Sequence, residues 1–271
     1  MPYRLKANKP FDQQFRLVGK DQLSKAIRDL EDQPNGPHEA VHDARKRFKR
    51  VRALYRLVQF GAPDFRRAEN ARIRDIARSL SAVRDATALV ETVDYLLGLA
   101  HNPEEKAALA SACDALKKRR DDIAAHEHDL PAKIRAAIHG CHEAVGALEG
   151  FDLQETPGRT AKRLGKAWRK QLVQAHEALQ ACEDDAHAET YHDLRKSGQA
   201  YWMHLSLLRD AWPSAMLAKQ NQTKALVDLL GHEHDLSVLT LLVNDQPELF
   251  GSGENLALLL GAIIARQQHL R

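Results

Sequence analysis

Val41-His42-Asp43-Ala44-Arg45-Lys46 occurs in two related copies in the chain, and this repeat indicates how the fold is organised. The second copy, Tyr191-His192-Asp193-Leu194-Arg195-Lys196, follows 150 positions later. A second pair of segments has the same offset: Leu80-Ser81-Ala82-Val83-Arg84-Asp85-Ala86 and Leu230-Gly231-His232-Glu233-His234-Asp235-Leu236. Two matches at one spacing, without a gap between them, indicate a tandem duplication. The residues kept in both copies are mainly basic residues and histidine.

The composition favours an all-α fold with a sizeable core, in one large domain or two of ordinary size. Hydrophobic residues make up 44% of the 271 residues, and aromatic residues only 6%. The formal net charge of +3 hides a strong local asymmetry. Between His42 and Arg84 there are 13 Lys and Arg against four acidic residues, a net charge of +9. Such a local excess of positive charge favours a polyanionic partner.

The cysteines and the N-terminal segment bear on the cellular compartment. The three cysteines, Cys113, Cys141 and Cys182, are far apart and outside any CxxC spacing. This usage is typical of incidental thiols in a reducing compartment. Residues 1–15 contain no apolar signal region, and no apolar run reaches the length of a membrane span. We therefore expect a soluble, cytoplasmic protein without a membrane partner.

Helical patterns fill nearly the whole chain and are interrupted by proline and glycine. Before a linker at 151–158, we expect helices over about 12–32, 37–59, 64–99 and 103–150, the last broken or restarted at Pro131. After the linker, we expect helices over about 159–183, 188–211, 213–243 and a last one to the C-terminus. Four helices in each half and short loops predict a pair of helical bundles packed together, formed by residues 1–150 and 151–271.

The expected helix over 37–59 has one apolar face and one cationic face. At about 100° per residue, five of its basic side chains fall within an arc of roughly 120° around His42. Ala44, Phe48 and Val51 fall on the opposite side. A solvated face normally mixes charges, because like charges three or four residues apart repel each other. We therefore favour a ligand-binding face, whose cations are Arg45, Lys46, Lys49, Arg52 and Arg56.

Further basic stripes occur on the expected helices that begin near 64, 159 and 213. If a pseudo-twofold axis relates the halves, these stripes can face one another across the interface. Arginine pairs bidentately with phosphate oxygens, lysine acts as a point charge, and histidine is a switchable donor. A groove lined in this way suits a chain of phosphates. The stripes contain Arg67, Arg74, Arg78, Lys162, Lys166, Lys170 and Lys224.

These motifs resemble the CHAD family, a histidine-bearing α-helical domain. The similarity rests on the two cassettes, on Asn70-Ala71-Arg72-Ile73-Arg74-Asp75 and on the paired segments at 80 and 230, and it extends from about Asp12 to the C-terminus. The resemblance implies two pseudo-twofold-related four-helix bundles with a basic central groove or pore. It also implies binding of inorganic polyphosphate and association with polyphosphate granules. We expect no enzymatic activity and no cofactor.

The resemblance carries binding roles onto positions that match the family motifs. In the second half two matches fail, since Gln199 stands where Lys49 does and Trp202 where Arg52 does. The first half should therefore contribute more charge. The matched positions are His42, Arg45, Lys46, Lys49, Arg52, Arg74, Arg78, His192, Arg195, Lys196 and Lys224; the helical faces add Arg56, Arg67, Lys162, Lys166 and Lys170.

A metal-dependent phosphohydrolase is one alternative, because His-Asp pairs recur and His-Glu-His-Asp occurs at 126–129 and 232–235. On a helix, however, His232 and His234 lie about 200° apart and cannot share one ion. No set of carboxylates is expected to point with the histidines. We therefore predict no catalytic residue and no metal site.

A nucleic-acid (RNA) binding module is the second alternative, because any phosphate-binding groove attracts RNA or DNA. The basic helices contain few aromatic residues for base stacking, so nucleic acid is a secondary partner. A helical scaffold that docks an acidic protein is a third alternative. Sulfate or phosphate ions are candidate smaller ligands of the same groove.

Overall fold

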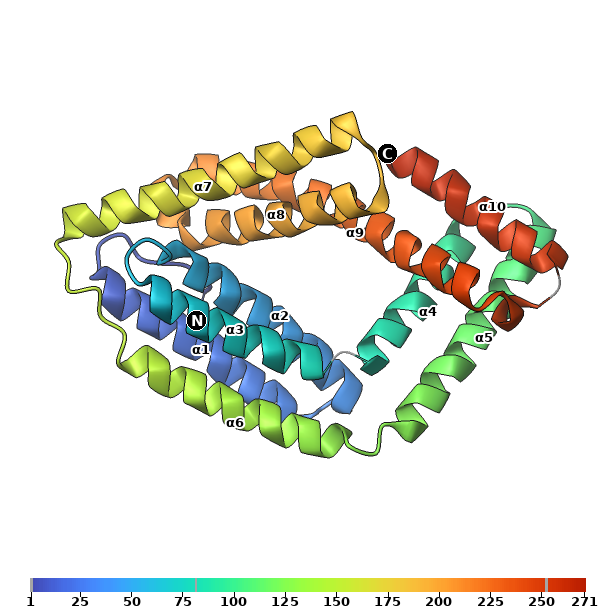
Figure 1. The fold of residues 1–271 in the computed structure, drawn as a ribbon, viewed down its shortest axis with the longest axis horizontal. Helices are drawn as coiled ribbons and strands as arrows, with labels where there is room; N and C mark the ends of the chain where they lie inside the picture. Colours follow the sequence, from blue (N-terminus) through green and yellow to red (C-terminus); the bar gives the residue numbers. More distant parts are fainter. Residues whose placement is uncertain (1, 81, 252) are drawn as a thin grey trace. The chain divides into compact units, whose positions relative to one another are not determined.

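The computed structural model describes residues 2–80, 82–251 and 253–271, and this part of the chain is all-α (Figure 1). The predicted fold class is confirmed. The helices described are α1 (Phe11–Asp32), α2 (Pro37–Leu57), α3 (Pro63–Ser79), α4 (Ala82–Leu99), α5 (Pro103–His126), α6 (Leu130–Glu149), α7 (Pro157–Asp184), α8 (Ala188–Leu207), α9 (Pro213–Asp245) and α10 (Gly253–Leu270), with short 3₁₀ helices at Arg209–Ala211 and Pro247–Phe250.

The expected single helix over 64–99 is wrong. The structure has two helices there, because α3 ends at Ser79 and α4 begins at Ala82. Neither proline nor glycine marks this break, so the sequence pattern contains no stop signal. The break instead coincides with a boundary between two compact units of the chain, where Leu80 packs into the core of one and Leu89 into the core of the other. A new helix, α6, also begins next to Pro131, as expected. The described part of residues 1–150 therefore contains six α-helices rather than four.

The two compact units each combine segments from both sides of residue 150. Unit 1 comprises Met1–Ser81, Asp129–Glu177 and Lys196–Ala225. Unit 2 comprises Ala82–His128, Ala178–Arg195 and Leu226–Arg271. The division into halves of residues 1–150 and 151–271 stays a prediction, and so does the pseudo-twofold axis.

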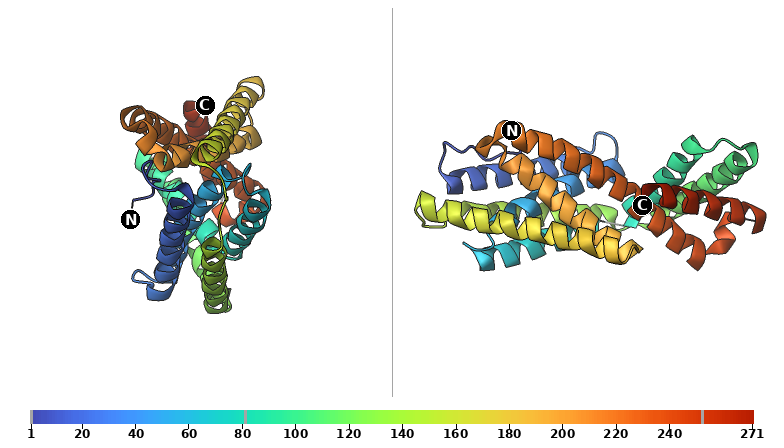
Figure 2. Two further views of the ribbon diagram at one scale, coloured as in Figure 1. Left: turned by 90° about the vertical axis from the view of Figure 1, so that its left-hand side faces the viewer. Right: turned by 90° about the horizontal axis from the view of Figure 1, so that it is seen from above.

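The core of unit 1 orients α2. This helix packs between α1 and α3, and α1 also packs against α6 (Figure 1 and Figure 2). The predicted apolar face is confirmed, since Ala44, Phe48 and Val51 are buried. Burying one large side chain of this kind contributes about 1.5–3 kcal/mol. Tyr55 extends this face into an aromatic cluster in which its ring lies 5.4 Å from that of Phe65. The predicted cationic face of α2 lies along a different side of the helix, where it contacts α3.

The core of unit 2 is formed by α4, α5, α10 and the C-terminal part of α9. It includes a buried carboxylate, because Glu233 is only 2% exposed. Arg271 Nη2 donates to Glu233 Oε1 at 2.6 Å, and Ser237 Oγ donates to the same atom at 3.1 Å. No helix in the described part of the chain is long and apolar enough to cross a membrane.

Replacing Arg271 by alanine should destabilise the protein by about 2 kcal/mol, because the buried Glu233 carboxylate then loses its cationic partner. Urea unfolding followed by circular dichroism measures this loss. Lys118→Ala, a change at an exposed position of α5, is the matched control. Equal unfolding midpoints for the two variants would contradict a stabilising ion pair.

Candidate functional site

The cationic face of α2 lies against α3 within unit 1. Arg45 Nη1 donates to the carbonyl of Ala77 at 2.7 Å. Seven residues further along α2, Arg52 Nε donates to Asn70 Oδ1 at 3.0 Å. Because these contacts run in opposite directions along the two helices, α2 and α3 are antiparallel. Basic side chains of both helices therefore lie beside one another.

Four arginines crowd together along this contact, and we call Arg52, Arg56, Arg66 and Arg74 the basic cluster. Burial lowers the pKa of Arg52, and the charges of Arg74 and Arg66 lower it further. Burial likewise lowers the pKa of Arg56, with smaller contributions from Arg52 and Arg66. Arginine remains charged in proteins, so the lowered pKa values report desolvation and like-charge repulsion.

Arg66 is a member of the basic cluster that the sequence analysis missed. Its Nε atom is buried and has no hydrogen-bond partner among the described residues. The signal was available, because Arg66, Asn70 and Arg74 follow one another at four-residue spacing on α3. The predicted basic stripe instead includes Arg67, the next residue in the sequence. That side chain is 77% exposed and lies 3.4 Å from Asp64 of its own helix.

The lysines of α7 approach the turn between α2 and α3, also within unit 1. Lys166 Nζ lies 4.4 Å from the centre of the Phe60 ring, and Lys170 Nζ lies 5.9 Å from it. Arg163 anchors the contact by donating to the Phe60 carbonyl and by pairing with Glu155 at 2.8 Å. Cations predicted from both sequence halves are thus brought together next to the last turn of α2.

The other predicted cations of unit 1 lie at or near the surface. Lys46 pairs with Asp43 at 3.0 Å. Arg78 pairs with Asp75 at 3.4 Å, and Arg74 of the cluster contacts the same carboxylate at 3.1 Å. Four further predicted lysines are also exposed, namely Lys49, Lys162, Lys196 and Lys224.

A buried histidine that sequence reasoning did not select supports the basic cluster. His204 of α8 is fully buried, and its Nε2 lies 2.8 Å from the carbonyl oxygen of Ala53 on α2. Because a carbonyl only accepts hydrogen bonds, the neutral ring carries its proton on Nε2. Burial lowers the pKa of His204 to about 4, and the neighbouring Arg56 charge acts in the same direction. His204 therefore fixes α8 to α2 without adding charge behind Arg56.

The two predicted residues of unit 2, His192 and Arg195, lie beside α9. The His192 ring stacks on His234, with 4.4 Å between ring centres and 3.1 Å between the two Nδ1 atoms. Arg195 Nη1 lies 3.9 Å from Asp235 Oδ1. His232 points elsewhere and stacks on Tyr95, which agrees with the predicted divergence of His232 and His234.

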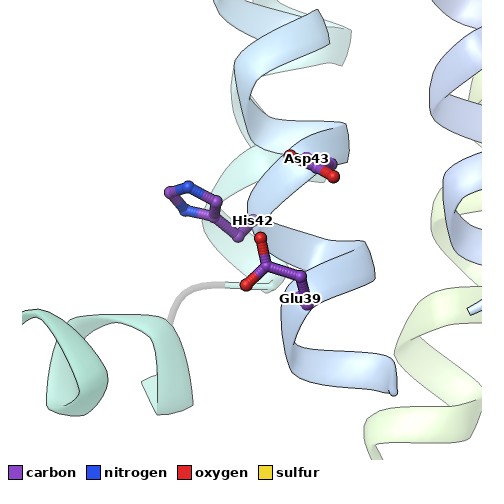
Figure 3. A group of neighbouring side chains, drawn as sticks. All are labelled: Glu39, His42 and Asp43. Atoms are coloured by element: carbon purple, nitrogen blue, oxygen red, sulfur yellow. The ribbon is translucent and has the colours of Figure 1, made fainter. Parts of the chain in front are cut away.

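The sequence predicts no set of carboxylates beside the histidines, and the structure corrects this expectation at His42. Glu39 and Asp43 do lie with His42 on α2, and one donor atom of each is within 4.8 Å of the others (Figure 3). Two carboxylates and an imidazole are suitable ligands for a divalent metal ion. It is the one such group found among the described residues. The Lys46 ammonium competes for Asp43, and the cationic face of α2 disfavours a positive ligand.

None of the curated proteins is significantly similar to the chain. The family model of the CHAD domain matches residues 21–244, a range that contains both cassettes, the basic cluster and the His192–His234 pair. The chain therefore belongs to the CHAD domain family.

Proposed function

We propose that this protein binds inorganic polyphosphate and catalyses no reaction, with the basic cluster as its principal anion site. The observation that carries the proposal is the mutual proximity of Arg52, Arg56 and Arg66, where the neighbours that lower the arginine pKa values are other arginines. Such repulsion costs stability in the free protein, and a bound anion would relieve it. Arginine forks provide several donors to the oxygens of a phosphate chain.

The aromatic side chains near the basic cluster favour polyphosphate over RNA. Lys166 covers the Phe60 ring, and Trp168 packs against Tyr201 with 5.2 Å between ring centres. Base recognition in single-stranded RNA depends on aromatic faces that can receive a base. A surface rich in arginine, with its aromatic rings already in contact with protein groups, suits a polyanion without bases. Binding of long chains in cells would then bring the protein to polyphosphate granules in the cytoplasm.

Competition between polyanions tests this proposal. Long-chain polyphosphate should displace a labelled polyphosphate at a lower charge concentration than single-stranded RNA of equal total charge, at one fixed ionic strength. Fluorescence anisotropy measures the displacement. Equal potency of the two competitors would contradict the proposed ligand and favour a nucleic-acid binding module. Release of phosphate in the presence of Mn²⁺ would instead favour a metal-dependent phosphohydrolase acting through Glu39, His42 and Asp43.

A further inference from the structure

The second copy of the duplicated sequence replaces an arginine by a histidine. At the 150-residue offset, Leu80 corresponds to Leu230 and Asp85 to Asp235, so Arg84 corresponds to His234. The same offset relates His42 to His192. The first copy therefore contains one histidine and one permanently charged arginine at these positions. The second copy contains two histidines, and the structure places these two in contact.

The contact geometry admits only one proton between the two rings. The Nδ1 atoms of His192 and His234 are 3.1 Å apart, so one nitrogen donates and the other must accept. If both rings were protonated on both of their nitrogens, two N–H groups and two positive charges would face each other. A second proton is therefore unfavourable in the stacked arrangement unless the rings separate or an anion accepts both hydrogen bonds.

Charged groups of α8, α9 and α4 adjoin the pair in the sequence or line the pocket beside it. On α8 the neighbours in sequence are Asp193 and Arg195, and on α9 they are His232, Glu233 and Asp235. Asp85 of α4 lines, together with His234 and Asp235, a pocket of about 300 Å³. Arg84 and Glu91, which pair at 3.0 Å, are close enough to Asp235 to affect its ionisation, and Glu233 is held by Arg271, the residue that follows α10. Among all these groups, only the imidazoles have ordinary pKa values between pH 6 and 8.

We propose that His234 is a phosphate-binding residue of the second copy, and that His192 and His234 bind the polyanion together after taking up a second proton. This inference rests on the proposed binding of polyphosphate. A phosphate oxygen that accepts from both rings stabilises the doubly protonated pair, so binding by unit 2 is coupled to proton uptake. Affinity at this site rises as the pH falls from 8 to 6. The equivalent position of the first copy, Arg84, lacks this dependence because its charge does not change.

The chain itself supplies the matched variant, His234→Arg, which restores the residue of the first copy. Calorimetric titration with long-chain polyphosphate in two buffers of different ionisation enthalpy counts the protons taken up. The wild-type protein should take up as much as one proton more than His234→Arg. Between pH 6 and pH 8, the affinity of the wild-type protein for polyphosphate should fall about tenfold more than that of His234→Arg. His234→Gln, which cannot become charged, should lose the part of the affinity that increases at low pH, and identical pH dependence in all three proteins would overturn the proposal.

A measurement without polyphosphate separates this inference from the proposed function. The imidazole NMR signals of His192 and His234 in the free protein should titrate in two coupled steps. Only one step should remain for His192 in His234→Gln. Independent, single-step titration of the two histidines in the wild-type protein would refute the pairing, whether or not polyphosphate binds. Coupled titration with no polyphosphate binding in any variant would refute the proposed function, and with it the phosphate-binding role of His234.

Discussion

Replacing Arg52 and Arg74 by glutamine should weaken the binding of long-chain polyphosphate about 100-fold. Each arginine loses a charge-assisted contact with phosphate, and hydrogen bonds to charged groups contribute about 1.5–3 kcal/mol each. The slope of log affinity against log salt should also become shallower by about one for each lost contact. Titrations at several salt concentrations measure both quantities.

The same double variant separates a binding role from a structural one. Arg52 and Arg74 repel each other, so their removal relieves repulsion while it costs the hydrogen bond from Arg52 to Asn70. The free energy of unfolding without ligand should therefore change by no more than about 1 kcal/mol. Lys118→Ala on α5 controls for the loss of an exposed charge far along the chain. Normal affinity with reduced stability would show that the basic cluster serves the fold and not a ligand.

Acidification should destabilise the protein through His204, by about 3 kcal/mol between pH 6.5 and pH 4. The pKa of this ring is lowered to about 4 in the folded protein, whereas an unfolded histidine takes up its proton near pH 6.5. Across this range the unfolded state binds a proton that the folded state excludes. The free energy of unfolding therefore falls as the pH falls. The destabilisation that arises from His204 reaches its full size below pH 4.

His204→Gln isolates this contribution from those of the carboxylates, because Gln keeps an amide donor for the Ala53 carbonyl and does not titrate. Urea unfolding at half-unit pH steps should give a slope shallower than that of the wild-type protein by about one proton. His128→Gln, at an exposed position, should leave the slope unchanged. Parallel curves for His204→Gln and the wild-type protein would mean that the buried ring is already charged.

Local sequence patterns predicted the helices well, since proline marks the starts of α2, α3, α5, α7 and α9. They also predicted the two faces of α2, because a hydrophobic period is a property of one helix. The break between α3 and α4 could not be predicted in the same way. It follows from the packing of Leu80 and Leu89 into different cores, which is a property of the whole fold.

The candidate site shows the same limit. The basic residues of α2 and α3 were identified as stripes, but the arginine cluster depends on how the two helices pack. Arg66 was therefore missed, and Arg67 was included although it faces solvent. His204 gave no sequence signal because a buried histidine is recognisable only by its environment. His234 did carry a signal, the replacement of an arginine in the duplicated segment, but its contact with His192 required the structure.

The most direct test of the central claim is a crystal structure of the protein grown with a short inorganic polyphosphate. Phosphorus positions identified by anomalous scattering would locate the anion. We expect phosphate oxygens within hydrogen-bond distance of the guanidinium groups of Arg52, Arg66 or Arg74. Polyphosphate bound elsewhere on the chain, with water alone on these three arginines, would contradict the central claim.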